Sequence, residues 1–330
     1  MTNRPLVATM IGDPCGVGPE VIAKAWASGE VHRYSRPVLI GSQYAMEQGA
    51  DIAGLDVSVR KVSSLDALHD SPDVIDIIDT GRLAPDEITL GQNNAACGRA
   101  SADWLDEADR LARKGDVAAT IMGPISSEAM KMGGVIDKVI SPQPGKSYLF
   151  LLTGPLRVVH LTDHMPLRQV CDVVSSDLVF GALSLINESL KTWGIARPRI
   201  GVAGLNPHAV GAEDDAEIRP GVARAQEAGI DVDGPIAPDT VFRRCIEERY
   251  DVVLAMYHDQ GHIAVKTWGF VGNCVIILGP PYLHMSVAHG TAHDIVGKGI
   301  ANHEMILTAM KMAGSLASGK GFLQENKGGN

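Results

Sequence analysis

Three histidines each follow an apolar run that predicts a buried strand: His164, His208 and His258. The strands are predicted at residues 156–161, 200–203 and 252–256. In a parallel sheet the carboxyl ends of the strands meet at one edge, so we expect the three imidazoles to lie close together. Neutral imidazoles bind divalent metals, and a metal site is therefore one interpretation. The alternative is three unrelated polar residues, each of which simply ends its strand.

A second stretch with chemical potential is the glycine-rich sequence from His289 to Asn302, which reads HGTAHDIVGKGIAN. Its glycines let the backbone approach a ligand closely, and the Asp294 carboxylate stays available to accept hydrogen bonds from hydroxyl groups. A loop of this composition could hold the ribose of a nucleotide. The alternative is an ordinary glycine-rich turn without a ligand.

Weaker signals accompany these two stretches. The segment Gly12–Glu20 is a glycine loop that leads into a helix near Pro19, which fits phosphate binding and simple helix packing equally well. Lys146 lies in a predicted loop at residues 141–147, where it could offer a cation to a ligand or simply be solvated. Lys266 could carry charge or a proton beside a substrate oxygen, or be a surface lysine.

The histidines and the glycine-rich loop need a framework of strands to position them. Further apolar runs occur at residues 6–11, 37–41, 74–78 and 117–122, and segments with one apolar helical face lie between them. This alternation predicts an α/β fold with largely parallel sheets and flanking helices. A chain of 330 residues with 45% hydrophobic content can bury a large core, and this length is commonly divided into two lobes.

The bulk composition disfavours several classes of protein. A net charge of −10 and a pI near 5.5 argue against nucleic-acid and membrane-surface binding, because both need a concentrated basic face. The five cysteines are widely spaced, odd in number and contain no CxxC pair, which argues against a disulfide framework or a zinc ribbon. The first apolar segment is too short for a signal sequence or a membrane span. We therefore expect a cytoplasmic protein that binds neither nucleic acid nor membrane.

The motifs around these residues resemble a known group of enzymes. HGTAHDIVGKGIAN is similar to the cofactor loop of the isopropylmalate and isocitrate dehydrogenases, except at His293, where those enzymes carry proline. YHDQG, followed by Lys266, resembles their relative, the 4-hydroxythreonine-4-phosphate dehydrogenase (PdxA) family. GDPCGVGPE, TDHMPLR, GLNPHA and PIAPDT also resemble that family, although Val210 stands where the pattern has glycine. The resemblance runs from about residue 6 to about residue 315 and indicates a divergent member.

The resemblance implies a two-lobed fold of the isocitrate/isopropylmalate dehydrogenase type. Residues 1–125 and 260–320 would form a nucleotide-binding lobe. Residues 126–259 would form the lobe for substrate, metal and dimerisation, and residues 321–330 a flexible tail. The family forms homodimers whose active site lies at the interface between the subunits, so we expect the same here.

The resemblance also assigns cofactors. His164, His208 and His258 match the three metal-binding histidines of the family, which would hold zinc, magnesium, manganese or cobalt. Asp163 and Asp259 would orient the imidazoles. The nucleotide would be NAD, because a carboxylate at the ribose repels the 2′-phosphate of NADP. The residues that match its adenosine half are His289, Gly290, Ala292, Asp294 and Asn302.

For the substrate, the resemblance implies a small hydroxy acid. Lys266 matches the substrate-binding lysine of the family, and Lys266 and Asp239 are the candidate catalytic residues; Asp239 is expected to be a helix N-cap or to face the cleft. The family's PGHTE loop is shortened here, near Lys146, and its substrate-binding asparagine and arginine correspond to Val275 and His284. We expect Lys146 and His284 to contact the substrate, and a phosphorylated substrate to bind weakly.

Taken together, the residues and the resemblance predict a metal- and NAD-dependent dehydrogenase that oxidises a β-hydroxy carboxylate, with decarboxylation following where the product is a β-keto acid. One alternative is a dehydrogenase for a cyclic cis-dihydrodiol carboxylate. A second is a catalytically silent member that binds ligands without turnover. A third, an acyl-phosphate transferase of related fold, is disfavoured because it needs neither the three histidines nor Asp294.

Overall fold

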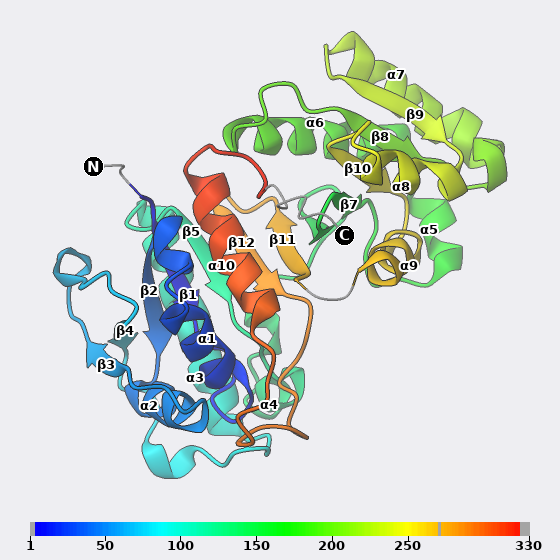
Figure 1. Ribbon diagram of the computed structural model, residues 1–330. Helices are drawn as coiled ribbons and strands as arrows, with labels where there is room; N and C mark the ends of the chain where they lie inside the picture. Colours follow the sequence, from blue (N-terminus) through cyan, green and yellow to red (C-terminus); the bar gives the residue numbers. More distant parts are fainter. Residues whose placement is uncertain (1–3, 270–271, 324–330) are drawn as a thin grey trace. The chain divides into compact units, whose positions relative to one another are not determined.

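The computed structural model describes residues 4–269 and 272–323, and these form two compact units (Figure 1). The first unit runs to Ile140 and resumes at Pro281–Ser318. The second unit comprises Ser141–Pro280 and the chain from Gly319.

The sheet of the first unit has parallel pairing between all its described neighbours, in the order β3-β4-β2-β1-β5-β12. The strands are β1 Leu6–Met10, β2 Arg36–Gly41, β3 Ser58–Lys61, β4 Val74–Asp79, β5 Ala119–Met122 and β12 Leu283–Val287. Its central strands are buried along nearly their whole length, which explains why they read as continuous apolar runs.

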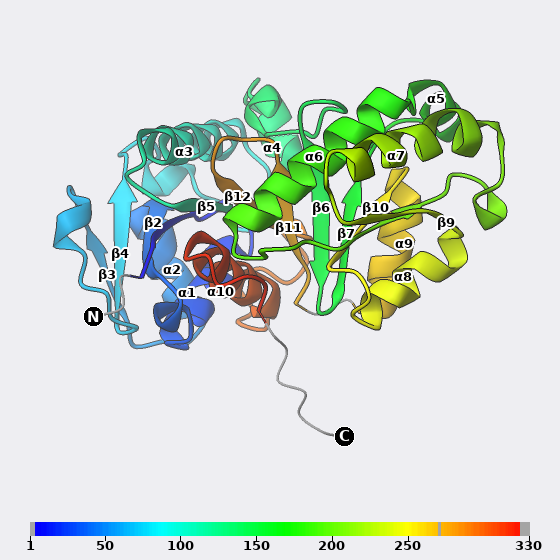
Figure 2. The same cartoon turned by 90° about the horizontal axis from the view of Figure 1, so that it is seen from above.

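Helices cover both faces of this sheet (Figure 2). They are α1 Gly18–Ala27, α2 Gln43–Ile52, α3 Ala95–Lys114, α4 Ser127–Met132 and α10 Glu304–Ala317. Helices α3 and α4 pack together on one face, and α1, α2 and α10 lie on the other (Figure 2). The apolar stripe of α3, which includes Trp104, Ala108 and Leu111, repeats at helical spacing and is buried, as predicted.

The sheet of the second unit is mixed, in the order β11-β6-β7-β10-β8-β9. The strands are β6 Tyr148–Thr153, β7 Leu156–His160, β8 Ile200–Ala203, β9 Val232–Ile236, β10 Val252–Ala255 and β11 Cys274–Leu278. The hairpin β6–β7 and the pair β11–β6 are antiparallel, whereas β7, β10, β8 and β9 run parallel. The three histidine-bearing loops therefore follow three neighbouring parallel strands.

Helices also flank this second sheet on both sides (Figure 2). They are α5 Leu167–Val173, α6 Ser176–Thr192, α7 Arg219–Glu227, α8 Pro238–Ile246 and α9 His258–Trp268, together with the 3₁₀ turn η5 Pro207–Ala209. Helices α8 and α9 pack on the parallel strands, and α6 packs on α7. Within the part of the chain that the structure describes, no single helix is long and apolar enough to cross a membrane.

The α/β class and the mostly parallel strands predicted from the sequence are confirmed. Ser126 accepts a hydrogen bond from the Ala129 N–H at 3.0 Å and caps α4. The expectation that Asp239 could be an N-cap is wrong. Ala237 is the N-cap of α8, because Pro238 begins the helix and moves Asp239 into its first turn.

The structure divides the chain at Ile140 and Pro280, rather than at residues 125 and 259 as the sequence suggested. The segment after residue 125 stays with the first unit because α4 packs against α3. The segment after residue 259 stays with the second because α9 packs on β7 and β11 pairs with β6. Most of the expected tail, residues 321–330, lies outside the described residues.

Candidate active site

Two of the three predicted metal histidines lie side by side in the second unit. The ring centroids of His164 and His258 are 4.8 Å apart. Asp163 Oδ2 lies 3.0 Å from His164 Nδ1, and Asp259 Oδ1 lies 2.7 Å from His258 Nδ1. Because a carboxylate accepts from each Nδ1–H, the two Nε2 atoms are left for another partner. Both rings border a hollow of about 500 Å³, which Leu167 and Val170 of α5 line on its apolar side.

The framework that places these rings follows from the strands. β7 and β10 are parallel neighbours, so the loops that leave their carboxyl ends start beside each other. The Thr162 hydroxyl donates to the Met256 carbonyl at 2.9 Å and joins the two loops. His258 is the first residue of α9, so its ring leaves the sheet edge at the start of a helix.

Two further histidines, His160 and His262, extend this cluster, and the sequence analysis missed both. The His262 ring stacks on the His258 ring at 3.7 Å, and its Nδ1 lies 3.1 Å from His160 Nε2. His160 Nδ1 in turn lies 3.0 Å from the Leu149 carbonyl oxygen. A side chain on Gly261 would collide with His160, because a Cβ there would lie 2.3 Å from His160 Nε2.

These two inner imidazoles are neutral at physiological pH. Burial, reinforced by His262, lowers the pKa of His160 to about 3. Burial, reinforced by His258, lowers the pKa of His262 to about 4. A signal for His262 was present, because His258 and His262 have the HxxxH spacing that places two imidazoles on one helix face. His160 is the last residue of β7 and carries no motif.

His208 is not brought to this cluster within the chain. The described side chains that converge are Asp163, His164 and His258, and His208 is not among them. His208 lies exposed in η5, and its backbone has a left-handed φ of 58°. A positive φ is uncommon outside glycine and marks a position that the surrounding structure holds in place.

The other predicted substrate residues of the second unit are exposed. Lys266 lies on α9, two turns beyond His258, and its charge helps to lower the pKa of His262. Asp239 accepts a hydrogen bond from the Thr240 hydroxyl at 2.9 Å. Lys146 lies in a tight turn, and among the described residues its ammonium has no hydrogen-bond partner.

The glycine-rich loop of the first unit is shaped by backbone contacts. Asp294 is exposed, and among the described residues no hydrogen bond engages its carboxylate. Ala292 has a left-handed φ of 47°, and His289 Nδ1 lies 2.8 Å from the Gly290 carbonyl oxygen. Asn302 is partly engaged, since its Oδ1 accepts from the Glu304 N–H at 2.8 Å. A loop that binds a nucleotide needs exposed polar groups and a backbone that bulky side chains do not cover, and this loop has both.

The C-terminal half of this loop is anchored to α1. Lys24 Nζ donates to the carbonyl oxygens of Gly299 and Ala301, at 2.9 Å each. The buried Glu20 accepts from the Ala301 N–H at 2.9 Å and pairs with Lys24 at 2.7 Å. Glu20 belongs to the GDPCGVGPE motif, so this motif stabilises the backbone of the glycine-rich loop.

His284 lies in a separate cavity of the first unit, with a volume of about 200 Å³. The ring is buried on β12, and its Nδ1 lies 2.8 Å from the Thr120 hydroxyl. Burial lowers the pKa of His284 to about 4, so the ring is neutral at physiological pH. The cavity wall also carries Asp109, whose carboxylate accepts from the Tyr282 hydroxyl at 2.6 Å.

Comparison with known proteins adds a family to this geometry. The family model described as pyridoxal phosphate biosynthetic protein PdxA matches residues 33–313. A protein of Novosphingobium aromaticivorans, provisionally named 4-hydroxythreonine-4-phosphate dehydrogenase, is 61% identical over 321 residues, which is 97% of each chain.

Two solved structures carry the comparison further. The 4-hydroxythreonine-4-phosphate dehydrogenase of Burkholderia phymatum is 33% identical, with a TM-score of 0.83 over 95% of this chain and 98% of its own. The terephthalate 1,2-cis-dihydrodiol dehydrogenase of Burkholderia xenovorans LB400 is 30% identical, with a TM-score of 0.68 over 94% of this chain and 98% of its own.

Proposed function

The chain belongs to the PdxA family of dehydrogenases, and we propose that it is a metal- and NAD-dependent enzyme that oxidises a β-hydroxy carboxylate. The observation that carries this proposal is the pair of rings of His164 and His258, 4.8 Å apart, each with a carboxylate on its Nδ1. Carboxylate–histidine pairs of this kind are the usual surroundings of a protein-bound metal.

The residues around the pair fit a divalent metal. Both Nε2 atoms are available, and the buried Asp163 Oδ1 has no hydrogen-bond partner among the described residues. A mixed nitrogen and oxygen donor set suits zinc, cobalt, manganese or magnesium, in decreasing order of preference for imidazole. When bound, the metal would act as a Lewis acid that polarises the hydroxyl group of the substrate.

His208 would complete the site from the other subunit of a homodimer. In its own chain it lies apart from the converging ligands, yet it is exposed and held with a left-handed φ. A motif residue with a constrained backbone and, among the described residues, no hydrogen-bond partner fits a contact made across an interface.

The remaining residues of the second unit would handle the substrate. Lys266 lies exposed on α9 and its charge acts on His262. As an ammonium it would bind the substrate carboxylate, and as a neutral amine it would accept the proton of the hydroxyl. Asp239, exposed in the first turn of α8, is the second candidate for proton transfer. The neutral inner rings of His160 and His262 would hold the outer rings in position without adding charge.

The loop 289–302 would bind NAD, which accepts the hydride. The exposed Asp294 carboxylate would accept from both ribose hydroxyls, and it would repel the additional phosphate of NADP. His289, Gly290, Ala292 and Asn302 would contact the adenosine half through backbone and side-chain groups.

We further propose that the substrate lacks a phosphate group. The relatives from Novosphingobium and Burkholderia phymatum are named for a phosphorylated substrate, but here His284 stands where the family pattern has an arginine. His284 is neutral, and the wall of its cavity carries three carboxylates, Asp106, Asp109 and Asp137, against one ammonium, that of Lys138, which pairs with Asp106. The contribution that we expected from His284 to binding an anion is therefore absent at neutral pH, which leaves Lys146 as the cation of that expected pair.

A cyclic cis-dihydrodiol carboxylate is the alternative substrate. The observation that favours it is the structural match to a terephthalate 1,2-cis-dihydrodiol dehydrogenase, which is named for an unphosphorylated diol. The vicinal hydroxyls of such a diol would meet the same histidine cluster, and its carboxylate would meet Lys266.

NADH absorbance in a substrate screen tests these proposals. Chelator-treated protein is reloaded with each of the four metals and given 4-phosphohydroxythreonine, unphosphorylated β-hydroxy acids or cis-dihydrodiol carboxylates. We expect turnover with an unphosphorylated compound, and none without metal. A kcat/KM above roughly 10⁴ M⁻¹s⁻¹ for the phosphorylated compound would contradict the substrate proposal. Binding of NAD and metal without any turnover would favour the catalytically silent alternative.

A further inference from the structure

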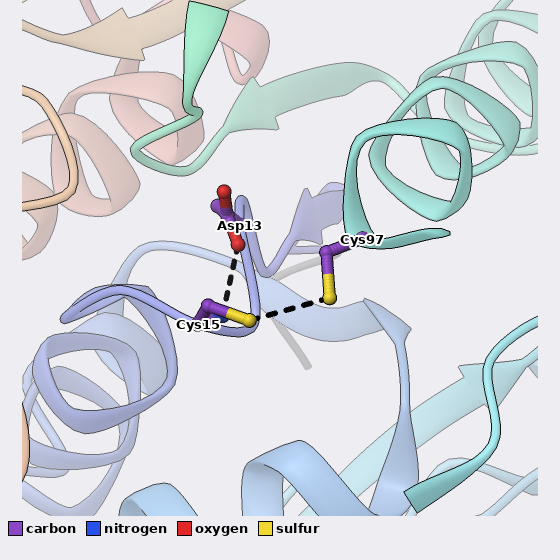
Figure 3. A group of neighbouring side chains, drawn as sticks. All are labelled: Asp13, Cys15 and Cys97. Carbon is purple, nitrogen blue, oxygen red and sulfur yellow. Dashed lines mark hydrogen bonds between the residues drawn. The ribbon is translucent and has the colours of Figure 1, made fainter. Parts of the chain in front are cut away.

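Cys15 and Cys97 form a buried pair of thiols in the first unit. Their Sγ atoms lie 3.3 Å apart, although 82 positions separate the residues in the sequence (Figure 3). Both side chains have no solvent exposure. Cys15 lies in the glycine loop after β1, and Cys97 lies in the first turn of α3. Among the described residues, the remaining cysteines, Cys171, Cys245 and Cys274, form no such pair.

The Asp13 carboxylate lies near both sulfurs, so a metal must be considered first. Two thiolates on one tetrahedral zinc lie about 3.8 Å apart, because each Zn–S bond is about 2.3 Å long. The observed sulfurs are closer than that. Asp13 Oδ1 accepts from the Cys15 N–H at 2.8 Å, and the other carboxylate oxygen points away from the sulfurs (Figure 3). The geometry therefore favours bonding between the sulfurs over shared coordination.

We propose that Cys15 and Cys97 are a reversible dithiol–disulfide pair, oxidised by a small peroxide. A disulfide bond is about 2.05 Å long, so the two sulfurs need to approach by about 1.3 Å. Hydrogen peroxide is small enough to reach a buried pair through local opening, which larger disulfide reagents are not.

Cys15 is the sulfur that reacts first. The hydrogen bond between the two thiols lowers the pKa of Cys15 below its usual value. The same hydrogen bond, together with burial, raises the pKa of Cys97. The Asn94 side chain supports this assignment, since its amide donates to Cys15 Sγ at 3.6 Å while its Oδ1 accepts from the Cys97 N–H at 2.8 Å.

The reaction balances in two steps. The Cys15 thiolate attacks one peroxide oxygen, the O–O bond breaks, and the leaving hydroxide takes up the proton that Cys15 had lost, which gives a sulfenic acid and water. The Cys97 sulfur then attacks the Cys15 sulfur, the S–O bond breaks, and the Cys97 proton leaves with the hydroxyl group as a second water. Two thiols and one peroxide thus give one disulfide and two waters.

The disulfide would change the glycine-rich loop 289–302, and this consequence rests on the proposed nucleotide site. The residues that follow Cys15 contact the loop directly. The Val17 N–H donates to the Thr291 carbonyl at 3.0 Å, and a side chain on Gly16 would collide with Thr291. The Cys15 carbonyl also accepts from the Gly91 N–H at 2.8 Å. Part of the approach of about 1.3 Å between the two sulfurs would therefore be transmitted from Cys15 to Thr291, and a displacement on the order of 1 Å can cost on the order of 100-fold in turnover.

Peptide mapping of peroxide-treated protein tests the proposal. A Cys171→Ser background removes the exposed thiol, which would otherwise react with peroxide. We expect the count of free thiols to fall from four to two, with a Cys15–Cys97 linked peptide that dithiothreitol removes. In the Cys97→Ser variant, dimedone should trap a sulfenic acid at Cys15. Recovery of Cys15 and Cys97 as free thiols, or of Cys15 as an unlinked sulfinic acid, would overturn the proposal. So would stoichiometric zinc that the Cys15→Ala variant fails to bind.

A second measurement separates this proposal from the nucleotide proposal. Hydrogen exchange in residues 289–302 should differ between oxidised and reduced protein, and the Cys15→Ala/Cys97→Ala double variant should show no such difference. NAD affinity, measured by calorimetry in the same samples, should fall on oxidation. If reduced protein binds no NAD, the nucleotide proposal fails, whereas the linked peptide and the exchange data still decide the cysteine pair. Unchanged exchange in a fully cross-linked sample would show that the disulfide does not reach the loop.

Discussion

The histidine cluster of the second unit and the glycine-rich loop of the first unit are both proposed ligand sites, yet they are built in opposite ways. In the cluster, side chains are positioned by other side chains. The carboxylates of Asp163 and Asp259 bond to the outer rings, and His262 bonds to His160. In the loop, the backbone is held instead, by Lys24 and Glu20 of α1, while the Asp294 carboxylate stays exposed. Changes in single side chains should therefore act on chemistry in the cluster and on affinity in the loop.

Replacing His258 gives the largest expected effect. His258→Ala removes a proposed ligand and the ring on which His262 stacks. Loss of an outer-shell partner typically weakens metal binding by about 10- to 100-fold, so loss of the ligand itself should exceed about 100-fold. Elemental analysis after dialysis checks the metal content, and NADH formation should be lost in parallel. Unchanged metal content would show that the cluster is not the metal site.

The pH dependence of the free energy of unfolding tests whether burial keeps the His284 imidazole neutral. His284 titrates near 4 when folded and near 6.5 when unfolded, so the unfolded chain binds the extra proton between these values. The free energy of unfolding should therefore decrease as the pH falls from 6.5 towards 4, by up to roughly 3 kcal/mol from this residue.

Urea titrations at several pH values measure this dependence. His284→Gln keeps a polar partner for Thr120 and should flatten the curve over that range. His289→Gln changes a ring outside the cavity and serves as the matched control, which should follow the wild type. Parallel curves for His284→Gln and the wild type would contradict the assignment.

In the glycine-rich loop, Asp294→Ala should act on affinity only. Loss of a carboxylate that accepts from two ribose hydroxyls costs about 1 to 3 kcal/mol, so NAD binding should weaken by roughly one to two orders of magnitude. Thermal stability should not change, since the carboxylate has no partner among the described residues. Calorimetry measures both nucleotides, and the exposed Asp51→Ala of α2 is the control. Wild-type protein that binds NADP as tightly as NAD would refute the role of Asp294.

The smallest expected effect is that of Asp259→Asn. Asp259 is exposed, so its hydrogen bond to His258 competes with water, and metal affinity should fall by about tenfold, the lower end for such partners. Asp163→Asn should cost more, because the Asp163 carboxylate is buried and its bond to His164 competes less with water than that of Asp259. Metal titrations of the two variants side by side check the order. Equal losses would mean that burial does not distinguish the two carboxylates.

The sequence predicted the elements better than it predicted their contacts. Continuous apolar runs predicted β1, β8 and β10 because strands buried on both faces leave that pattern. The strand-end argument also brought His164 and His258 together correctly, since it depends only on parallel pairing. It did not hold for His208 within the chain, because His208 lies in η5 with a left-handed φ and is not among the described side chains that converge.

The sequence analysis missed residues that become neighbours only when the chain packs. In the sequence His160 is an ordinary strand residue. Only the pairing of β7 with β10 and the packing of α9 on β7 bring it next to His262. Cys15 and Cys97 were interpreted as widely spaced thiols, because no local sequence pattern predicts that the loop after β1 packs against the start of α3. The domain divisions were also misplaced, by the segment with α4 at the first and by α9 and β11 at the second, because packing of these elements, rather than motif position, decides where a unit ends.

The hydrogen bond between His160 and the Leu149 carbonyl has a consequence for proton positions. A carbonyl oxygen only accepts, so the neutral His160 ring must carry its proton on Nδ1 and present a lone pair at Nε2. His262 must then donate through Nδ1, which leaves its own Nε2 unprotonated. The Leu149 carbonyl oxygen in the β6–β7 hairpin thus determines the tautomer of His160 and, through His160, that of His262. The face that α9 offers beside His258 is consequently a proton acceptor, not a donor.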